Sequence, residues 1–179
     1  LVIPATFVSA TVAPEMDLSI VDANGNAVAT LVKEDSYFLR VHVSGLETLY
    51  AAGVKVDATG AVFGPKEDLV KRYSGYSEFK DANNGDILEI NTANGVEAAS
   101  DSMKIKFTKN LSTVGAPPIM IDNFALVDIP FTVTADAGEE LRFTFATGAS
   151  DTYVQVTSAA TTGKYSITST SKPLAAEDF

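Results

Sequence analysis

Two short loops carry side-chain oxygen atoms at alternate positions, a donor spacing typical of calcium-binding loops. The twelfth position counted from Asp22, where an EF-hand has its bidentate glutamate, is Lys33, so the first loop lacks the EF-hand pattern. The alternative is a pair of hairpin turns in which Asn-Gly supplies a positive φ and aspartate caps the backbone. We retain calcium as the candidate cofactor. Its expected ligands are Asp22, Asn24, Asn26, Asp81, Asn83 and Asp86.

Tyrosine side chains around another polar stretch suggest a different ligand. Tyr73 and Tyr76, with Tyr50 and Phe79 as further aromatic residues, have the composition of a platform on which a sugar ring could stack. The chain has no tryptophan, the strongest large stacking surface, and tyrosine is also a common half-buried strand and loop residue. A carbohydrate-binding module that uses Tyr73 and Tyr76 is therefore the weaker alternative.

Residue types that carry catalysis are sparse. The chain has no cysteine and a single histidine, His42, which excludes thiol chemistry and any site built on several imidazoles. There is no Gly-x-Ser-x-Gly elbow and no glycine-rich phosphate loop. The adjacent Glu139 and Glu140 follow a glycine and are expected to open a solvated strand. The sequence therefore predicts a protein without catalytic activity.

Net charge limits the choice of partner. The 179 residues carry a formal charge of −10, which repels nucleic acid and anionic membrane surfaces. No apolar run approaches the roughly 20 residues of a membrane-spanning helix. We therefore expect a protein partner.

Apolar residues alternate with polar ones along most of the chain. In residues 36–44 the odd positions are apolar, and 103–109, 129–135 and 141–146 repeat this period-2 pattern. Pairs ending in glycine, such as Asn24-Gly25 and Asn84-Gly85, separate these segments. Residues 65–72 offer a weak helix signal. The pattern predicts an all-β fold, a single antiparallel β-sandwich.

The first twelve residues are apolar and uncharged and lie ahead of the predicted sandwich. They form either an edge strand of their own sandwich or a strand donated to the sheet of a neighbouring subunit. Head-to-tail donation would build a homo-oligomer or filament, and we take it as the main hypothesis. The expected organisation is an N-terminal arm over 1–16, a sandwich over 17–172 and a short acidic tail over 173–179. The residues expected to bind the partner are Val2, Ile3, Phe7, Val8 and Val12.

Three segments resemble the cohesin-like family of extracellular jelly-roll sandwiches. Residues 35–57 are similar to its early strand, loop and strand passage, 84–90 to a middle strand, and 124–138 to its late core strands. The resemblance implies a jelly-roll sandwich that attaches to another protein outside the cell, and a monomeric module of the dockerin-binding type is the alternative function. Because the chain begins at Leu1 without a basic leader, we expect a mature extracellular or cell-surface chain.

Overall fold

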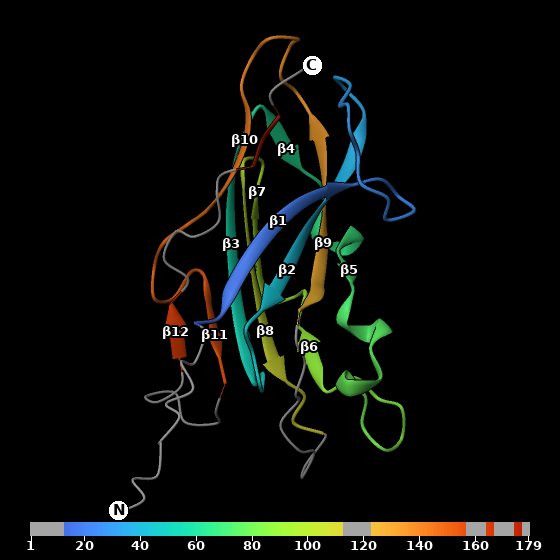
Figure 1. The fold of residues 1–179 in the computed structure, drawn as a ribbon, viewed down its shortest axis with the longest axis vertical. Coiled ribbons are helices and arrows are strands. Elements are labelled where there is room, and N and C mark those ends of the chain that lie inside the picture. Colours follow the sequence, from blue (N-terminus) through green and yellow to red (C-terminus); the bar gives the residue numbers. More distant parts are fainter. Residues whose placement is uncertain (1–12, 113–122, 157–163, 167–173, 177–179) are drawn as a thin grey trace, which may run out of the picture.

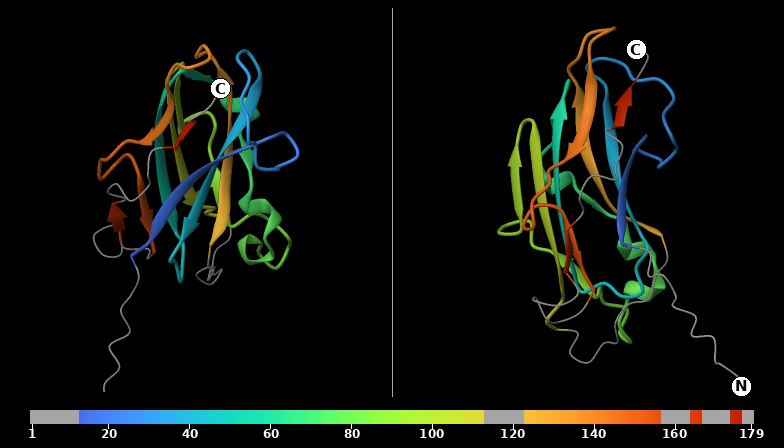
Figure 2. Two further views of the ribbon diagram at one scale, coloured as in Figure 1. Left: turned by 45° about the horizontal axis from the view of Figure 1, so that its top comes forward. Right: turned by 60° about the vertical axis from the view of Figure 1, so that its left-hand side comes forward.

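The computed structural model describes residues 13–112, 123–156, 164–166 and 174–176. Within them the chain forms two antiparallel sheets packed face to face (Figures 1 and 2). These residues contain no α-helix, only 3₁₀ turns at Lys66–Asp68, Tyr73–Gly75 and Ser77–Phe79. The predicted all-β antiparallel sandwich is confirmed. None of the described helices is long or apolar enough to cross a membrane.

Sheet A has five strands in the described part of the chain. Its central path runs β1-β2-β9-β4, and β5 also pairs with β9. Its strands are β1 (Glu15–Val21), β2 (Ser36–Ser44), β4 (Ala61–Phe63), β5 (Val70–Lys71) and β9 (Phe124–Val133). β2 has the bounds that the alternation predicts. Its Leu39, Val41 and Val43 are fully buried, while the residues between them are only half-buried.

Sheet B is built around β3, which pairs with β8 on one side and with both β10 and β11 on the other. β6 and β7 extend the sheet beyond β8, and β12 and β13 extend it beyond β11 and β10. Its strands are β3 (Ala51–Thr59), β6 (Leu88–Ile90), β7 (Val96–Ala99), β8 (Ser102–Lys109), β10 (Leu141–Phe145), β11 (Tyr153–Gln155), β12 (Lys164–Ser166) and β13 (Leu174–Ala176).

The core lies between the sheets and is filled by the inward side chains of both. Phe131 of β9 contacts Phe143 of β10 with ring centroids 4.7 Å apart, so aromatic packing joins the two layers. Val54, Val56, Ile105 and Phe107 fill the same layer from β3 and β8 and are fully buried. Burial of this apolar area, at roughly 25 cal/mol per Å², is the main stabilising term for such a sandwich.

Some element boundaries differ from the sequence-based expectation. β1 begins at Glu15 and Met16 is fully buried, so the expected division after residue 16 falls inside a strand. β13 pairs with β10 within the segment expected to be an acidic tail. The helix expected over 65–72 is wrong. A 3₁₀ turn follows Pro65, and Val70–Lys71 pairs with β9, because tertiary strand pairing outweighs a weak local helix preference.

Candidate functional site

The two oxygen-rich loops are self-contained turns in the structure. The Oδ1 atom of Asp22 accepts hydrogen bonds from the backbone N–H groups of Asn24 and Asn26, at 2.8 and 2.9 Å. The Asn26 side-chain amide also bonds Asp22, and this contact is the largest cause that lowers the pKa of the carboxyl. Asp81 accepts from the N–H groups of Asn83 and Gly85 in the same way.

Asp86 at the end of the second loop is bound differently. Burial raises the pKa of this carboxyl, but its ion pair with Lys80 and the hydrogen bond from Ser74 outweigh burial, and the pKa is lowered. Nowhere in the described ranges do three or more His, Cys, Asp or Glu side chains converge as metal ligands would. Calcium binding at these loops stays a prediction.

One of the two tyrosines expected to form a sugar platform is not on the surface. Tyr73 is fully buried, with its ring centroid 6.0 Å from that of Phe79 and 6.1 Å from that of Phe107. Burial raises the pKa of Tyr73 far above its ordinary value. Tyr76 is half-buried, and its hydroxyl accepts a hydrogen bond from the N–H of Ala125. The ring of Tyr73 therefore has no face open to a sugar.

A buried ion cluster links the loop segment 64–86 to β2 and β9 of sheet A. Asp128 of β9 is fully buried. Arg40 of β2 donates to both its carboxylate oxygens, at 2.8 and 3.0 Å, and Arg72 of the loop segment donates to Oδ2 at 2.5 Å. None of the site residues expected from the sequence belongs to this cluster. Its available signal was an aspartate in the middle of an otherwise apolar run, Phe124–Val133.

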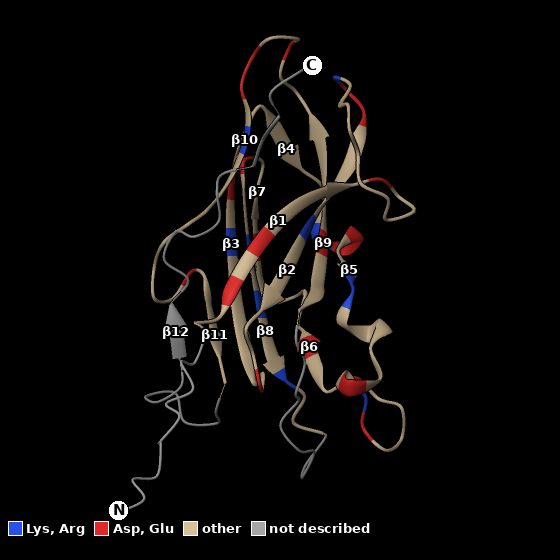
Figure 3. Cartoon of the chain, viewed as in Figure 1, with Lys and Arg blue, Asp and Glu red and all other residues tan. Residues whose placement is uncertain are grey.

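The outer face of sheet B is open by comparison. Along β3 and β8 the outward side chains are half-buried or exposed, while their neighbours fill the core. Lysines stand at the centre of this face in an acidic protein (Figure 3). Lys55 and Lys104 lie directly opposite each other on adjacent strands, and Lys106 follows on β8. Like charges placed opposite each other destabilise a sheet, so this arrangement costs stability.

Asp151 partly neutralises these lysines. Its Oδ1 atom lies 2.9 Å from Nζ of Lys104, and this bond is the main cause that lowers the pKa of Asp151 and raises that of Lys104. Lys55 makes a smaller contribution that also lowers the pKa of Asp151.

An aromatic surface adjoins the lysines. Tyr153 of β11 is in register with Gly53 of β3. A Cβ atom added to Gly53 would lie 2.3 Å from Cε1 of Tyr153 and 3.0 Å from the carbonyl oxygen of Asp151. The tyrosine ring therefore lies on the bare backbone of the glycine, and its burial raises the pKa of the hydroxyl. We call Gly53, Lys55, Lys104, Lys106 and Tyr153 the lysine face.

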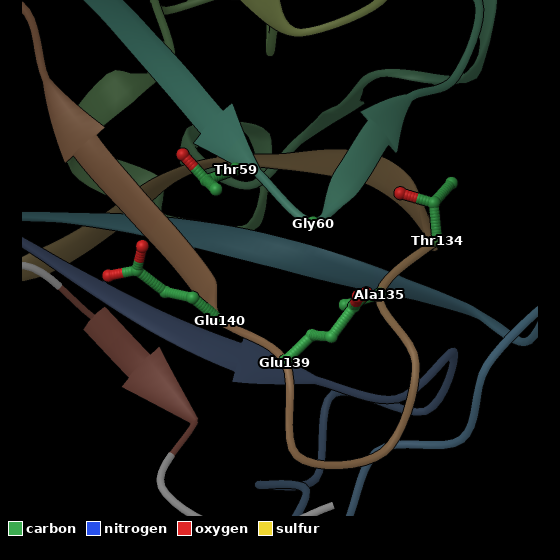
Figure 4. Close-up of a pocket in the computed structure, with 6 residues that line it drawn as sticks. All are labelled: Thr59, Gly60, Thr134, Ala135, Glu139 and Glu140. Atoms are coloured by element: carbon green, nitrogen blue, oxygen red, sulfur yellow. The ribbon is translucent and has the colours of Figure 1, made fainter.

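A cavity of about 410 Å³ lies where the β3–β4 turn meets the loop between β9 and β10 (Figure 4). Both of its carboxylates already have partners. Glu139 accepts from the N–H of Asp136 at 3.0 Å, and Glu140 pairs with Arg142 at 3.2 Å. These contacts fit a structural role for Glu139 and Glu140. The residues around the cavity are Thr59, Gly60, Thr134, Ala135, Glu139 and Glu140.

The residues expected to bind a partner through the N-terminal arm lie outside the described part of the chain. They are Val2, Ile3, Phe7, Val8 and Val12. The described chain begins at Ala13, which leads into β1 at the edge of sheet A.

Neither a protein-family model nor a curated protein matches this sequence. The fold, however, is cohesin-like, as the sequence resemblance predicted. A type II cohesin domain from the cellulosome of Acetivibrio cellulolyticus matches with a TM-score of 0.56 and 6% identity, over 91% of this chain and 94% of that one. The sixth cohesin of scaffoldin B from the same organism, solved in complex with a dockerin, matches with a TM-score of 0.55 and 10% identity, over 92% of this chain and 97% of that one. A chain of a cohesin–dockerin complex from Clostridium thermocellum matches with a TM-score of 0.53 and 9% identity, over 91% of this chain and 96% of that one.

Proposed function

We propose that this chain is a non-catalytic, extracellular protein-binding module. The observation that carries the proposal is the cohesin-like fold, since two of the similar domains were solved in complex with dockerins. The buried carboxylate of Asp128 is tied to two arginines and fixes structure, which also fits a binding role. The apolar N-terminal segment favoured self-assembly, but the fold likeness more directly supports the alternative, a module that binds a separate protein.

The lysine face is the surface we assign to that partner. On the outer side of sheet A, Asp128 of β9 is fully buried and paired with two arginines, whereas Lys106 on the outer side of β8 is exposed. Tyrosine is enriched among residues that dominate binding energy, and Tyr153 presents a ring beside the lysines. Opposed lysines cost stability in the free chain, and a partner with carboxylates at its surface would relieve that repulsion.

Lysine acetylation footprinting of the native assembly tests this proposal. In the assembly isolated from its source, Lys55 and Lys106 should react several-fold more slowly than in the separated chain. Lys71, an exposed residue of β5 on the other sheet, should react equally in both and serves as the control within the same sample. If Lys106 in the native assembly reacts as fast as in the separated chain, the partner does not bind the lysine face.

Self-assembly is the second candidate function. In it, copies of this chain would form a filament or a surface layer by donating their N-terminal strands to one another. The observation that favours it is the edge of sheet A. β1 pairs with β2 along one side, and within the described residues no other strand of the sheet lies beyond it.

A further inference from the structure

Asn110 begins an asparagine-x-serine triplet, Asn110-Leu111-Ser112. The chain has eight asparagines, and none of the others is followed two residues later by serine or threonine. Such a triplet, with any residue except proline in the middle, is the acceptor pattern for an N-linked sugar. The pattern is short, so the position and the contacts of these three residues must show whether they fit that role.

The triplet lies in a turn at one end of the sandwich. β8 ends at Lys109, at the lower end of the sandwich in Figure 1. The backbone N–H of Asn110 donates to the carbonyl oxygen of Ile87 at 2.7 Å, so the sheet still holds the asparagine in place. Leu111 is 90% exposed, and Ser112 is exposed as well. The turn therefore projects from the surface, as it must to carry a bulky, hydrophilic sugar.

The serine and the asparagine of the triplet contact each other. The Oδ1 atom of Asn110 accepts hydrogen bonds from the backbone N–H of Ser112 at 2.9 Å and from its Oγ at 2.7 Å. These donors stabilise the negative charge that the amide oxygen gains when the amide nitrogen gives up a proton. They therefore favour attack by Nδ2, the atom to which a sugar is joined.

Asn91 forms a similar turn without the hydroxyl. Its Oδ1 atom accepts from the backbone N–H groups of Ala93 at 3.0 Å and Asn94 at 3.3 Å. Alanine stands where the turn after β8 has Ser112, so this position offers no side-chain donor. Asn91 is exposed. The chain thus contains its own control, an exposed asparagine turn that lacks the acceptor pattern.

The contact of the Asn110 amide nitrogen is compatible with a sugar. Nδ2 donates to the carbonyl oxygen of Asp86 at 3.3 Å. Glycosylation replaces one of the two hydrogens on this nitrogen and keeps the other, so a bond to Asp86 does not have to be lost. The asparagine is half-buried, so the first sugar would be joined to a side chain that the sheet already orients.

We infer that Nδ2 of Asn110 carries an N-linked oligosaccharide. The donor is of the class of oligosaccharides carried on a lipid diphosphate. Nδ2 attacks the anomeric carbon of the first sugar, and a C–N bond forms as the C–O bond to the diphosphate breaks. The lipid diphosphate leaves with the electron pair, and the nitrogen loses one proton. This inference goes beyond the proposed protein-binding function and requires only that the chain is made on a secretory route.

The modified residue would border the lysine face. Lys104 and Lys106 of that face lie on β8, and Asn110 follows four residues after Lys106. At about 3.3 Å per residue, the backbone distance from Lys106 is about 13 Å. An oligosaccharide at Asn110 would therefore limit how far a partner extends along β8 beyond the lysines.

Peptide mapping by mass spectrometry, on the chain isolated from its source, tests the inference. The peptide that contains Asn110 should carry a sugar mass on this residue in most copies, and the peptide that contains Asn91 should carry none. An Asn110 peptide found mainly at its unmodified mass would overturn the inference. A sugar on Asn91 would contradict the role assigned to the serine hydroxyl.

Two variants made in the same cells test that role directly. S112T keeps a hydroxyl and should keep the sugar on Asn110, whereas S112A keeps only the backbone donor and should lose it. Circular dichroism of both should match the wild type, because the turn is exposed. A sugar on S112A at the wild-type level, or its loss from both variants, contradicts the inference. The readout is the mass at residue 110 and not the reactivity of the lysines, so the protein-binding proposal stands or falls separately.

Discussion

Replacement of Asp128 by asparagine should be the most damaging conservative change on the outer side of sheet A. The carboxylate is fully buried and accepts three hydrogen bonds from two arginines. Asparagine keeps the shape but removes the charge and turns one acceptor into a donor that faces guanidinium donors. Loss of one partner from a buried ion pair costs about 3–5 kcal/mol.

The exposure of the two arginines determines where in this range the loss of unfolding free energy should fall. The side chains of Arg40 and Arg72 are 17% and 32% exposed and keep some contact with water, which favours a value of about 3 kcal/mol. For a chain of this size that is a fall of about 6–12 °C in Tm. Urea unfolding measures the free energy. The matched control is D136N, because Asp136 pairs with Lys33 at the surface and should lose about 0–1 kcal/mol. A loss in D128N no larger than in D136N would refute the reasoning.

Two further changes test the turn geometry and the single histidine. Gly60 has a φ of 72° and a Cβ there would lie 2.4 Å from the carbonyl oxygen of Glu140, so G60A should lose about 2–4 kcal/mol in urea unfolding. G138A, at a φ of 83° but with open space around it, should lose only about 1–2 kcal/mol, and equal losses would contradict the steric argument. Burial, and then Arg40, lowers the pKa of His42 below its ordinary value of 6.5, so as the pH falls the imidazole is protonated first in the unfolded chain. Stability is then full above pH 6.5 and declines as the pH falls through the lowered pKa. Urea midpoints at pH 7 and 5.5 should differ less in H42Q than in the wild type.

The strands were predictable where one face is buried and the other is exposed to solvent. β2 and β8 alternate along their length, so a period of two was visible. The alternation indicated only the second half of β9, from Ile129, whereas the family resemblance over 124–138 also covered its first half. Every residue of its first half is buried, and a strand buried on both faces does not alternate in sequence.

The site was less predictable than the fold, because its parts meet only in three dimensions. Asp128 lies 88 residues from Arg40 and 56 from Arg72 in sequence, and no local pattern links them. Tyr73 was expected at the surface because its neighbours are polar, but the 3₁₀ turn at Tyr73–Gly75 directs its ring into the core. The stacking of Tyr153 on Gly53 depends on the register between β11 and β3, which the sequence does not reveal.

The position of β9 between β2 and β4 has a consequence for the order of events during synthesis. β2 ends at Ser44, but its second neighbour begins only at Phe124. At about 5–20 residues per second, the intervening residues take about 4–16 s to be made. Throughout that interval one side of β2 has no partner strand and Arg40 has no carboxylate to pair with, and the same holds for Arg72 from the time it is made. A nascent sandwich of this topology is therefore most exposed to pairing with other chains before β9 is made, and its loop segment can be fixed in place only after that strand emerges.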